Sequence, residues 1–213
     1  MPEIILPYEP IVVTDTTNLS REEWLAYRKT GIGGSEVAAI FGISPFGTAR
    51  DIYYDKLNIA AYYDDEENKY QKQIGTLLED TVAEMFEEVT GYRVFKIRKM
   101  YRSCEHPCMI ADVDFFIQLP DGSFAILECK TTSPDATAKW WDGSKPAIPL
   151  NYQLQGRHYS GYILDRLRIQ SWKIPLSSIM GKGGSTFCCR PLDYPPARTV
   201  GAVNGGRSPF TCR

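Results

Sequence analysis

The stretch FAILECKTTS, residues 124–133, joins an apolar run to two charged side chains. Its first four residues are apolar and bounded by turn-forming positions, which predicts a buried strand. Glu128 and Lys130 follow two positions apart, so the alternation of a strand places both side chains on one face. Buried charges are costly unless they are paired. The pattern therefore indicates a polar site where the strand ends.

A hairpin supplies partners for these two charges. The apolar segment before the strand is separated from it by PDG (residues 120–122), a strong turn signal. A hairpin centred on this turn places Asp114 opposite Glu128 and Asp112 opposite Lys130. Cross-strand neighbours share a face, so the four charged groups are expected to converge. A bulge in the turn would shift this register by one residue.

Two carboxylates that face each other repel unless a cation lies between them. Mg²⁺ takes oxygen ligands, and proteins commonly bind it through one or two carboxylates and a substrate phosphate. Asp114 and Glu128 are the candidate ligands, and the main-chain carbonyl of Cys129 can add a further oxygen. Lys130 can orient the attacking water and offset negative charge in a transition state. The alternative is a surface hairpin with ordinary ion pairs.

The segment from residue 73 to 90 is the clearest predicted helix. Its apolar residues recur at helical spacing and form one buried stripe, and Gly91 is placed to end the helix. Glu79 lies beside this stripe near the helix start, where a carboxylate suits the helix dipole. A solvated glutamate at a helix start is the alternative interpretation.

The remaining elements predict an α/β or α+β core with a mixed sheet flanked by helices. Ser20 and Glu23 form a capping-box pattern, and Ser35 and Thr48 are placed to cap two short helices. The expected elements are helices at 20–30, 36–41, 48–57, 73–90 and 150–164, and strands at 92–102, 110–119 and 123–130. Residues 1–165 are expected to form one domain. Residues 166–213 are rich in Gly, Pro, Ser and Arg, which predicts an irregular C-terminal segment.

Composition places few limits on function. The 213 residues are 43% hydrophobic and carry a net charge of −2, which is ordinary for a globular protein and gives no overall basic character. Two segments are locally basic, at residues 93–102 and 166–173. No apolar run reaches about 18 residues and no signal peptide is evident, which favours the cytoplasm.

The six cysteines do not form a recognisable metal motif. Cys104, His106 and Cys108 are close in sequence, but no C-x-x-C pair exists, and Cys188 and Cys189 are adjacent. This spacing disfavours a zinc or iron–sulfur site. Reduced cysteines in a reducing compartment are the simpler interpretation.

Four motifs in order, GTLLED, ADVDFF, LECKTT and NYQLQ, resemble the YqaJ-type viral recombinase exonucleases. That family includes lambda exonuclease and has the PD-(D/E)xK, restriction-endonuclease-like fold. The earlier segment RKTGIGGSEVAAIFGISPFGT is also typical of it. The match covers residues from about 20 to 165, and the order and spacing of five motifs is specific where any one alone is weak.

The resemblance implies roles for individual residues. The helix glutamate falls on Glu79, which binds metal or orients its waters, and the family's catalytic aspartate falls on Asp114. In this chain Asp112 takes the place of a small polar residue usual in the family. The implied catalytic set is Glu79, Asp114, Glu128, Lys130 and Gln153, and the implied metal ligands are Asp114, Glu128, Cys129 and Glu79.

The segment RKTGIGGSE falls where the family captures a DNA terminus. Glycines permit close backbone approach, and the first amides of the following helix can hold an anion. Arg28 and Ser35 are the implied phosphate-binding residues here, and Arg157 is expected to meet phosphate from the last helix. A simple turn before a helix is the alternative.

The resemblance implies a deoxyribonuclease dependent on Mg²⁺ or Mn²⁺ that degrades linear double-stranded DNA from an end in phage-type recombination. Its implied partners are DNA ends, a single-strand-annealing recombinase and further copies of itself in a ring, without a membrane. The implied location is the cytoplasm of a bacterial host of a phage or prophage. Two alternatives are a catalytically inactive DNA-end-binding module and an iron–sulfur nuclease of the CRISPR-adaptation type.

Overall fold

The computed structural model describes residues 10–60, 69–130, 140–142 and 145–159. Five helices lie in these ranges: α1 (Arg21–Arg28), α2 (Gly34–Ile40), α3 (Ala49–Lys56), α4 (Lys69–Thr90) and α5 (Leu150–His158). The strands there are β1 (Ile11–Asp15), β2 (Arg93–Phe95), β3 (Lys99–Arg102), β4 (Ile110–Asp112), β5 (Phe115–Gln118), β6 (Phe124–Leu127), β7 (Trp141–Asp142) and β8 (Lys145–Pro146).

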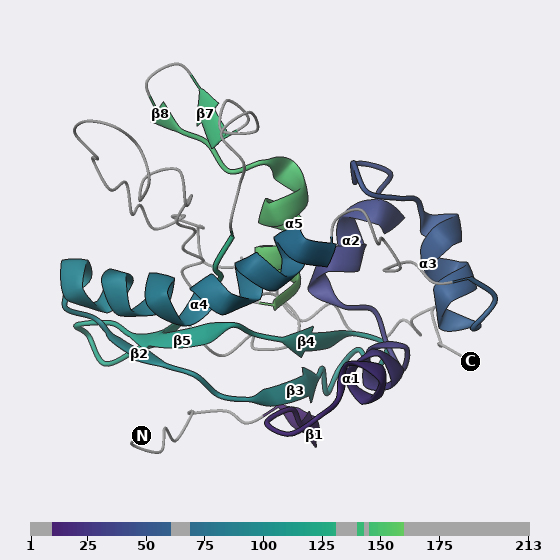
Figure 1. Ribbon diagram of the computed structural model, residues 1–213, viewed down its shortest axis with the longest axis horizontal. Coiled ribbons are helices and arrows are strands. Elements are labelled where there is room, and N and C mark those ends of the chain that lie inside the picture. The colour runs from purple at the N-terminus through teal and green to yellow at the C-terminus, as the bar shows by residue number, and fades with distance from the viewer. Residues whose placement is uncertain (1–9, 61–68, 131–139, 143–144, 160–213) are drawn as a thin grey trace, which may run out of the picture.

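The strands form two three-stranded antiparallel sheets, in the orders β1-β3-β4 and β2-β5-β6, and the small pair β7-β8. One isolated parallel bridge joins Ile32 to Met109. In Figure 1 the helix α4 runs along β2 and β5, and α1, α2 and α3 gather near the other end of the molecule. The predicted α+β class is confirmed.

The predicted hairpin is confirmed with its register. Phe115 pairs with Leu127 and Gln118 with Phe124, so the turn is centred where the sequence placed it. The expected pairing of Asp112 with Lys130 is wrong, because Asp112 ends β4 and pairs with Met100 of β3. The chain leaves one sheet after β4 and enters the other at β5, and this break ends the ladder.

The strands β5 and β6 are buried on both faces. One face packs against α4 in a cluster of Val82, Ala83, Phe86, Phe115, Ile117, Ala125, Leu127 and Cys129. The opposite face contributes Phe116 and Ile126 to a second cluster that includes Tyr101 and Tyr159. Alternation along β6 therefore directs odd-numbered side chains toward α4 and even-numbered ones toward α5. This alternation decides where the charged residues after Leu127 lie.

Helix starts follow the sequence signals in two of three cases. The side chains of Ser20 and Thr48 accept hydrogen bonds that cap α1 and α3, as predicted. The prediction that Ser35 caps α2 is wrong, because Gly33 is the N-cap and Glu36 accepts its N–H at 2.8 Å. At the far end of α4, Gly91 has φ of 71°, as expected for a residue that ends a helix.

The single strand expected at residues 92–102 is two strands in different sheets. β2 pairs with β5, whereas β3 pairs with β1 and β4. The connection, residues 96–98, carries the chain between the sheets. Alternating polar and apolar residues do not reveal such a crossing, since both halves keep the same pattern.

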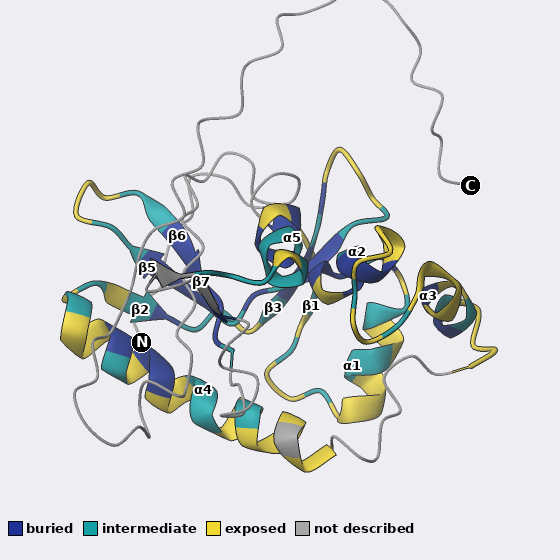
Figure 2. Cartoon of the chain, turned by 90° about the horizontal axis from the view of Figure 1, so that it is seen from above, coloured by how far each residue is buried: buried dark blue, intermediate teal, exposed yellow. Residues whose placement is uncertain are grey.

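Helices α2 and α5 approach closely at Gly34. A Cβ on Gly34 would lie 2.6 Å from the Tyr159 ring and 3.1 Å from Cγ of Gln155, so only glycine fits there. In Figure 2 much of α2 is buried, whereas α1 and α3 expose much of their surfaces. This contact fixes the position of α5 relative to the helix that follows the glycine segment.

Several sequence expectations lie outside the described residues. The end of the helix predicted to reach residue 164, the domain boundary near residue 165 and the C-terminal segment 166–213 belong to this group. None of the described helices is long and apolar enough to cross a lipid bilayer.

Candidate active site

A pocket of about 480 Å³ collects the acidic residues singled out from the sequence. Its walls come from helices α1, α2, α4 and α5, from the β2–β3 connection and from residues at the ends of strands β4, β5 and β6. Glu79, Asp112, Asp114, Glu128 and Lys130 all line it. The expected convergence of these charged side chains is therefore present in the structure.

Strand alternation explains how Glu128 and Lys130 reach the pocket. Leu127 and Cys129 pack in the cluster under α4, so the two charged residues point to the opposite face. Glu128 is only 1% exposed, and its Oε1 accepts a hydrogen bond from Lys130 Nζ at 2.6 Å. Asp114 stands directly before β5, and its Oδ2 accepts from the N–H of Cys129 at 2.8 Å. This bond ties Asp114 to the backbone between Glu128 and Lys130.

The carboxylates of the pocket influence one another's ionisation. Burial and the neighbouring Glu128 carboxylate raise the pKa of Asp114 well above its ordinary value. Burial by itself would lower the pKa of Lys130, but the carboxylates of Glu128 and Asp114 outweigh it and raise that pKa. Lys130 is consequently a charged ammonium at neutral pH. The site holds negative charge that a cation would stabilise.

Glu128 has one oxygen that no described residue satisfies. Its Oε1 accepts from Lys130 and from Gln155 Nε2, whereas its buried Oε2 has no hydrogen-bond partner among the described residues. A buried carboxylate oxygen without a partner is unfavourable unless an ion or a water binds it. The donor set is all oxygen, which fits a hard cation such as Mg²⁺. Across the described residues no three His, Cys, Asp or Glu side chains form a ready-made metal cluster, so waters or phosphate would have to complete the coordination.

Cys129 can contribute to such a site only through its backbone. Its side chain is buried in the cluster under α4, and burial raises the pKa of its thiol. The thiol therefore stays protonated and is unsuited to bind a metal as thiolate. Of the other cysteines, Cys104 is exposed and Cys108 half-buried, while Cys188, Cys189 and Cys212 lie outside the described residues.

Glu79 enters the pocket from α4. Its Oε2 lies 3.9 Å from Nζ of Lys96, which also contacts Asp80 Oδ1 at 2.7 Å. Burial raises the pKa of Glu79, and Lys96 and Lys130 oppose this shift. Lys96 belongs to the β2–β3 connection and also lies over the Phe115 ring, 4.9 Å from its centroid. The sequence predicts this segment as part of a locally basic strand and indicates no role for Lys96 in the site.

Asp112 is hydrogen-bonded to a side chain of α1. The indole Nε1 of Trp24 donates to Asp112 Oδ2 at 2.6 Å. The Trp24 ring in turn stacks against the guanidinium groups of Arg21 and Arg28, at 4.5 and 4.8 Å. Asp112 is therefore bound to a neighbouring side chain, while Asp114 is the aspartate tied to the Glu128 strand. The resemblance places the catalytic aspartate at Asp114.

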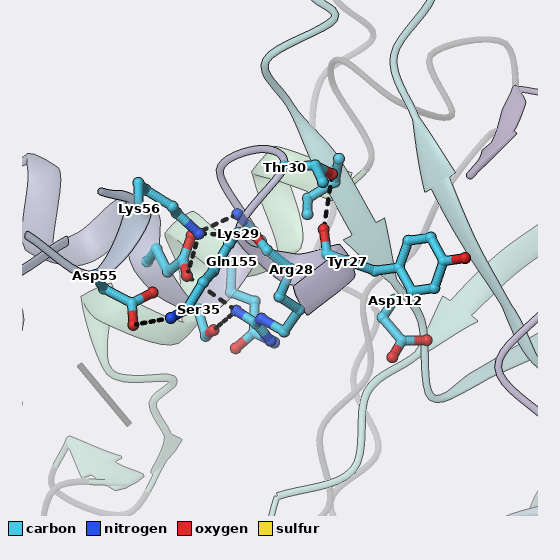
Figure 3. Close-up of polar contacts among 12 residues, drawn as sticks. Tyr27, Arg28, Lys29, Thr30, Ser35, Asp55, Lys56, Asp112 and Gln155 are labelled. Atoms are coloured by element: carbon cyan, nitrogen blue, oxygen red, sulfur yellow. Dashed lines mark hydrogen bonds and ion pairs between the residues drawn. The ribbon is translucent and has the colours of Figure 1, made fainter. Parts of the chain in front are cut away.

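Arg28 and Ser35, predicted to bind phosphate, both line the pocket. Nη2 of Arg28 donates to Oγ of Ser35 at 2.9 Å, which brings α1 and α2 together (Figure 3). The glycine segment therefore forms one rim of the pocket that contains the carboxylates.

The structure brings Gln155 rather than Gln153 to the pocket. Gln155 is buried and contacts Glu128 and the Tyr159 hydroxyl, whereas Gln153 donates to the backbone oxygen of Ile148 at 2.7 Å. Arg157 is exposed and does not line the pocket. NYQLQ contains both glutamines, and α5 has too weak an apolar stripe to show which one faces inward.

Known proteins resemble this chain in sequence. A family model described as "YqaJ-like viral recombinase domain" matches residues 23–161. A protein of Bacillus subtilis (strain 168) called "Uncharacterized protein YqaJ" is 36% identical over 152 residues. That alignment covers 71% of this chain and 45% of the relative, so the matched part spans less than half of the relative's length.

Proposed function

Because this chain belongs to the YqaJ-like viral recombinase family, we propose that it is a Mg²⁺-dependent deoxyribonuclease that degrades linear double-stranded DNA from an end. The family groups nuclease-related proteins of phage-type recombination. The charged pocket supports the part of this proposal that concerns a bound cation and a phosphate. The main support is that Asp114, Glu128, Glu79 and Lys130 line one pocket, in which Oε2 of Glu128 has no hydrogen-bond partner within the described part of the chain.

Asp114 and Glu128 would hold the metal, and Glu79 would hold its waters from the side of α4. A bound Mg²⁺ would polarise the scissile phosphate and lower the pKa of a coordinated water. Gln155 keeps Oε1 of Glu128 occupied together with Lys130, so Oε2 is the oxygen left for the ion. These side chains are fixed by strands and helices, which suits a site that must be preorganised.

Lys130 supplies positive charge beside the carboxylates. Its ammonium is kept charged by Glu128 and Asp114 and sits on the strand face that points into the pocket. In this position it can orient the attacking water and stabilise the charge that develops on the phosphate. Arg28 and Ser35 would bind a phosphate of the DNA end at the rim formed by α1 and α2.

Linear DNA is expected to be degraded in the presence of Mg²⁺ and left intact in EDTA. Covalently closed circular DNA of the same sequence should be left intact in both conditions, because it offers no end. Gel electrophoresis of both substrates over time measures this directly. Cutting of closed circles at the rate of linear DNA would reject the end-dependent part, and binding to ends without any cleavage would favour an inactive end-binding module.

A further inference from the structure

A buried ion cluster lies behind the rim of the pocket and joins α1, α2 and α3. Its centre is Glu36, which is fully buried at 0% exposure. Oε1 of Glu36 lies 2.9 Å from Nζ of Lys56 and 3.4 Å from Nη2 of Arg28, and its Oε2 accepts the N–H of Gly33. One carboxylate is therefore shared between two cations.

Arg28 is the member of this cluster that reaches the pocket. Its guanidinium is fixed by Ser35, by the Trp24 ring and by Glu36. A Cβ on Gly33 would lie 2.7 Å from Nη2 of Arg28, so the glycine makes room for the guanidinium. The side chain is held in one orientation before any ligand arrives.

Lys56 contacts Arg28 through Glu36 and through the backbone. Its Nζ also donates to the backbone oxygen of Arg28 at 2.8 Å, which ties the last turn of α3 to the end of α1. Lys56 does not line the pocket, and only 15% of its side chain is exposed. Burial lowers the pKa of Lys56 and the Glu36 carboxylate counteracts this, so the two groups depend on each other.

We propose that Lys56 is a positioning residue for DNA binding, which shares Glu36 with Arg28 and so leaves the Arg28 guanidinium with positive charge for a DNA phosphate. In a buried setting the attraction between close charges is strong. Without Lys56, the full charge of Glu36 would be directed at Arg28 and would compete with the phosphate. With Lys56 present, two cations face one carboxylate and the excess positive charge lies at the rim. The inference rests on the proposed function, because it takes the pocket to bind a DNA end.

The test measures binding of a fluorescent linear duplex with a 5′-phosphate end, in EDTA so that cleavage does not interfere. Lys56→Met is expected to weaken binding about tenfold, since a charge-assisted contact to phosphate is worth that much. Lys56→Arg keeps the charge and should retain affinity. In Mg²⁺, Lys56→Met should raise KM while kcat stays unchanged.

Lys29→Met is the matched control. Lys29 also links α1 to the region of α3, through Asn58 at 2.7 Å and Asp55 at 3.9 Å, but it has no contact with Glu36 among the described interactions. Lys29→Met removes one positive charge, as Lys56→Met does, from the same region of the protein. Binding by Lys29→Met should match wild-type, and an equal loss in the two variants would overturn the proposal in favour of a general charge effect.

The double variant Glu36→Gln/Lys56→Met separates positioning from simple structural support. It removes the carboxylate that would otherwise neutralise Arg28, so affinity should return to about wild-type level, within roughly threefold. This variant also avoids leaving a buried carboxylate short of a partner, which covers the case in which Lys56→Met alone does not fold. A folded double variant that binds about tenfold more weakly overturns the inference. A wild-type protein that binds no DNA end would contradict the proposed function itself.

Discussion

Replacement of Lys130 by methionine is expected to lower the rate of DNA cleavage by about 10³-fold and to leave DNA affinity within roughly threefold. Nζ of Lys130 lies 2.6 Å from Oε1 of Glu128 and faces the pocket that holds Asp114. Its charge would act on the developing phosphate charge rather than on the bound DNA. Cleavage is measured in single-turnover assays with Mg²⁺, and binding in EDTA.

Lys72→Met serves as the control for Lys130. Lys72 is exposed on α4 and does not line the pocket, so its loss removes the same charge without touching the site. This variant should cleave DNA like the wild-type protein. A Lys130→Met protein that cleaves at more than a tenth of the wild-type rate would remove Lys130 from the proposed mechanism.

Replacement of Asp114 by asparagine is expected to abolish cleavage and yet to stabilise the metal-free protein by about 3 °C in Tm. Burial of Asp114 and the neighbouring Glu128 carboxylate both raise the pKa of Asp114. An asparagine oxygen can still accept the N–H of Cys129, while the repulsion disappears. Asp114 would therefore destabilise the metal-free protein, although its carboxylate is needed for catalysis.

The raised pKa of Asp114 also predicts how the stability of the protein changes with pH. The pKa of Asp114 is raised on folding, so the unfolded chain ionises first as pH rises. The contribution of this group to folding is then largest below the ordinary carboxyl pKa and is lost as pH rises through the raised value. Asp114→Asn should lack that loss.

Single-turnover cleavage with Mg²⁺ checks the catalytic part of the Asp114 prediction, and thermal denaturation in EDTA and in Mg²⁺ checks the stability part. Wild-type protein should gain stability from Mg²⁺ because the ion binds only the folded state, and Asp114→Asn should lose most of that gain. Glu84→Gln, on the exposed surface of α4, is the control and should respond to Mg²⁺ like wild-type. A lower Tm for Asp114→Asn in EDTA would contradict the proposed repulsion.

The hairpin and its charged face could be predicted because both rest on local rules. The PDG turn fixed the register, and alternation then placed Glu128 and Lys130 away from the buried side of the strand. The long helix α4 followed from its apolar stripe in the same way, with Val82 and Phe86 in the core. In each case the pattern repeats over enough residues to exclude other arrangements.

The parts that could not be predicted depend on contacts between distant segments. Trp24 reaches Asp112 across 88 residues of sequence, and nothing local to either residue indicates that hydrogen bond. Lys96 lies in the connection between two sheets, which the sequence suggested was one continuous strand. The choice of Gln155 over Gln153 is decided by the packing of α5 on α2 at Gly34.

The most direct measurement for the central claim is a crystal structure with Mn²⁺, located by its anomalous scattering. The account predicts one ion in the pocket, bound by carboxylate oxygens of Asp114 and Glu128 at about 2.1 Å, close to the Mg²⁺ distance. Oε2 of Glu128 should be one of these oxygens. An ion bound elsewhere, or an empty pocket at saturating Mn²⁺, would contradict the proposed hydrolytic site.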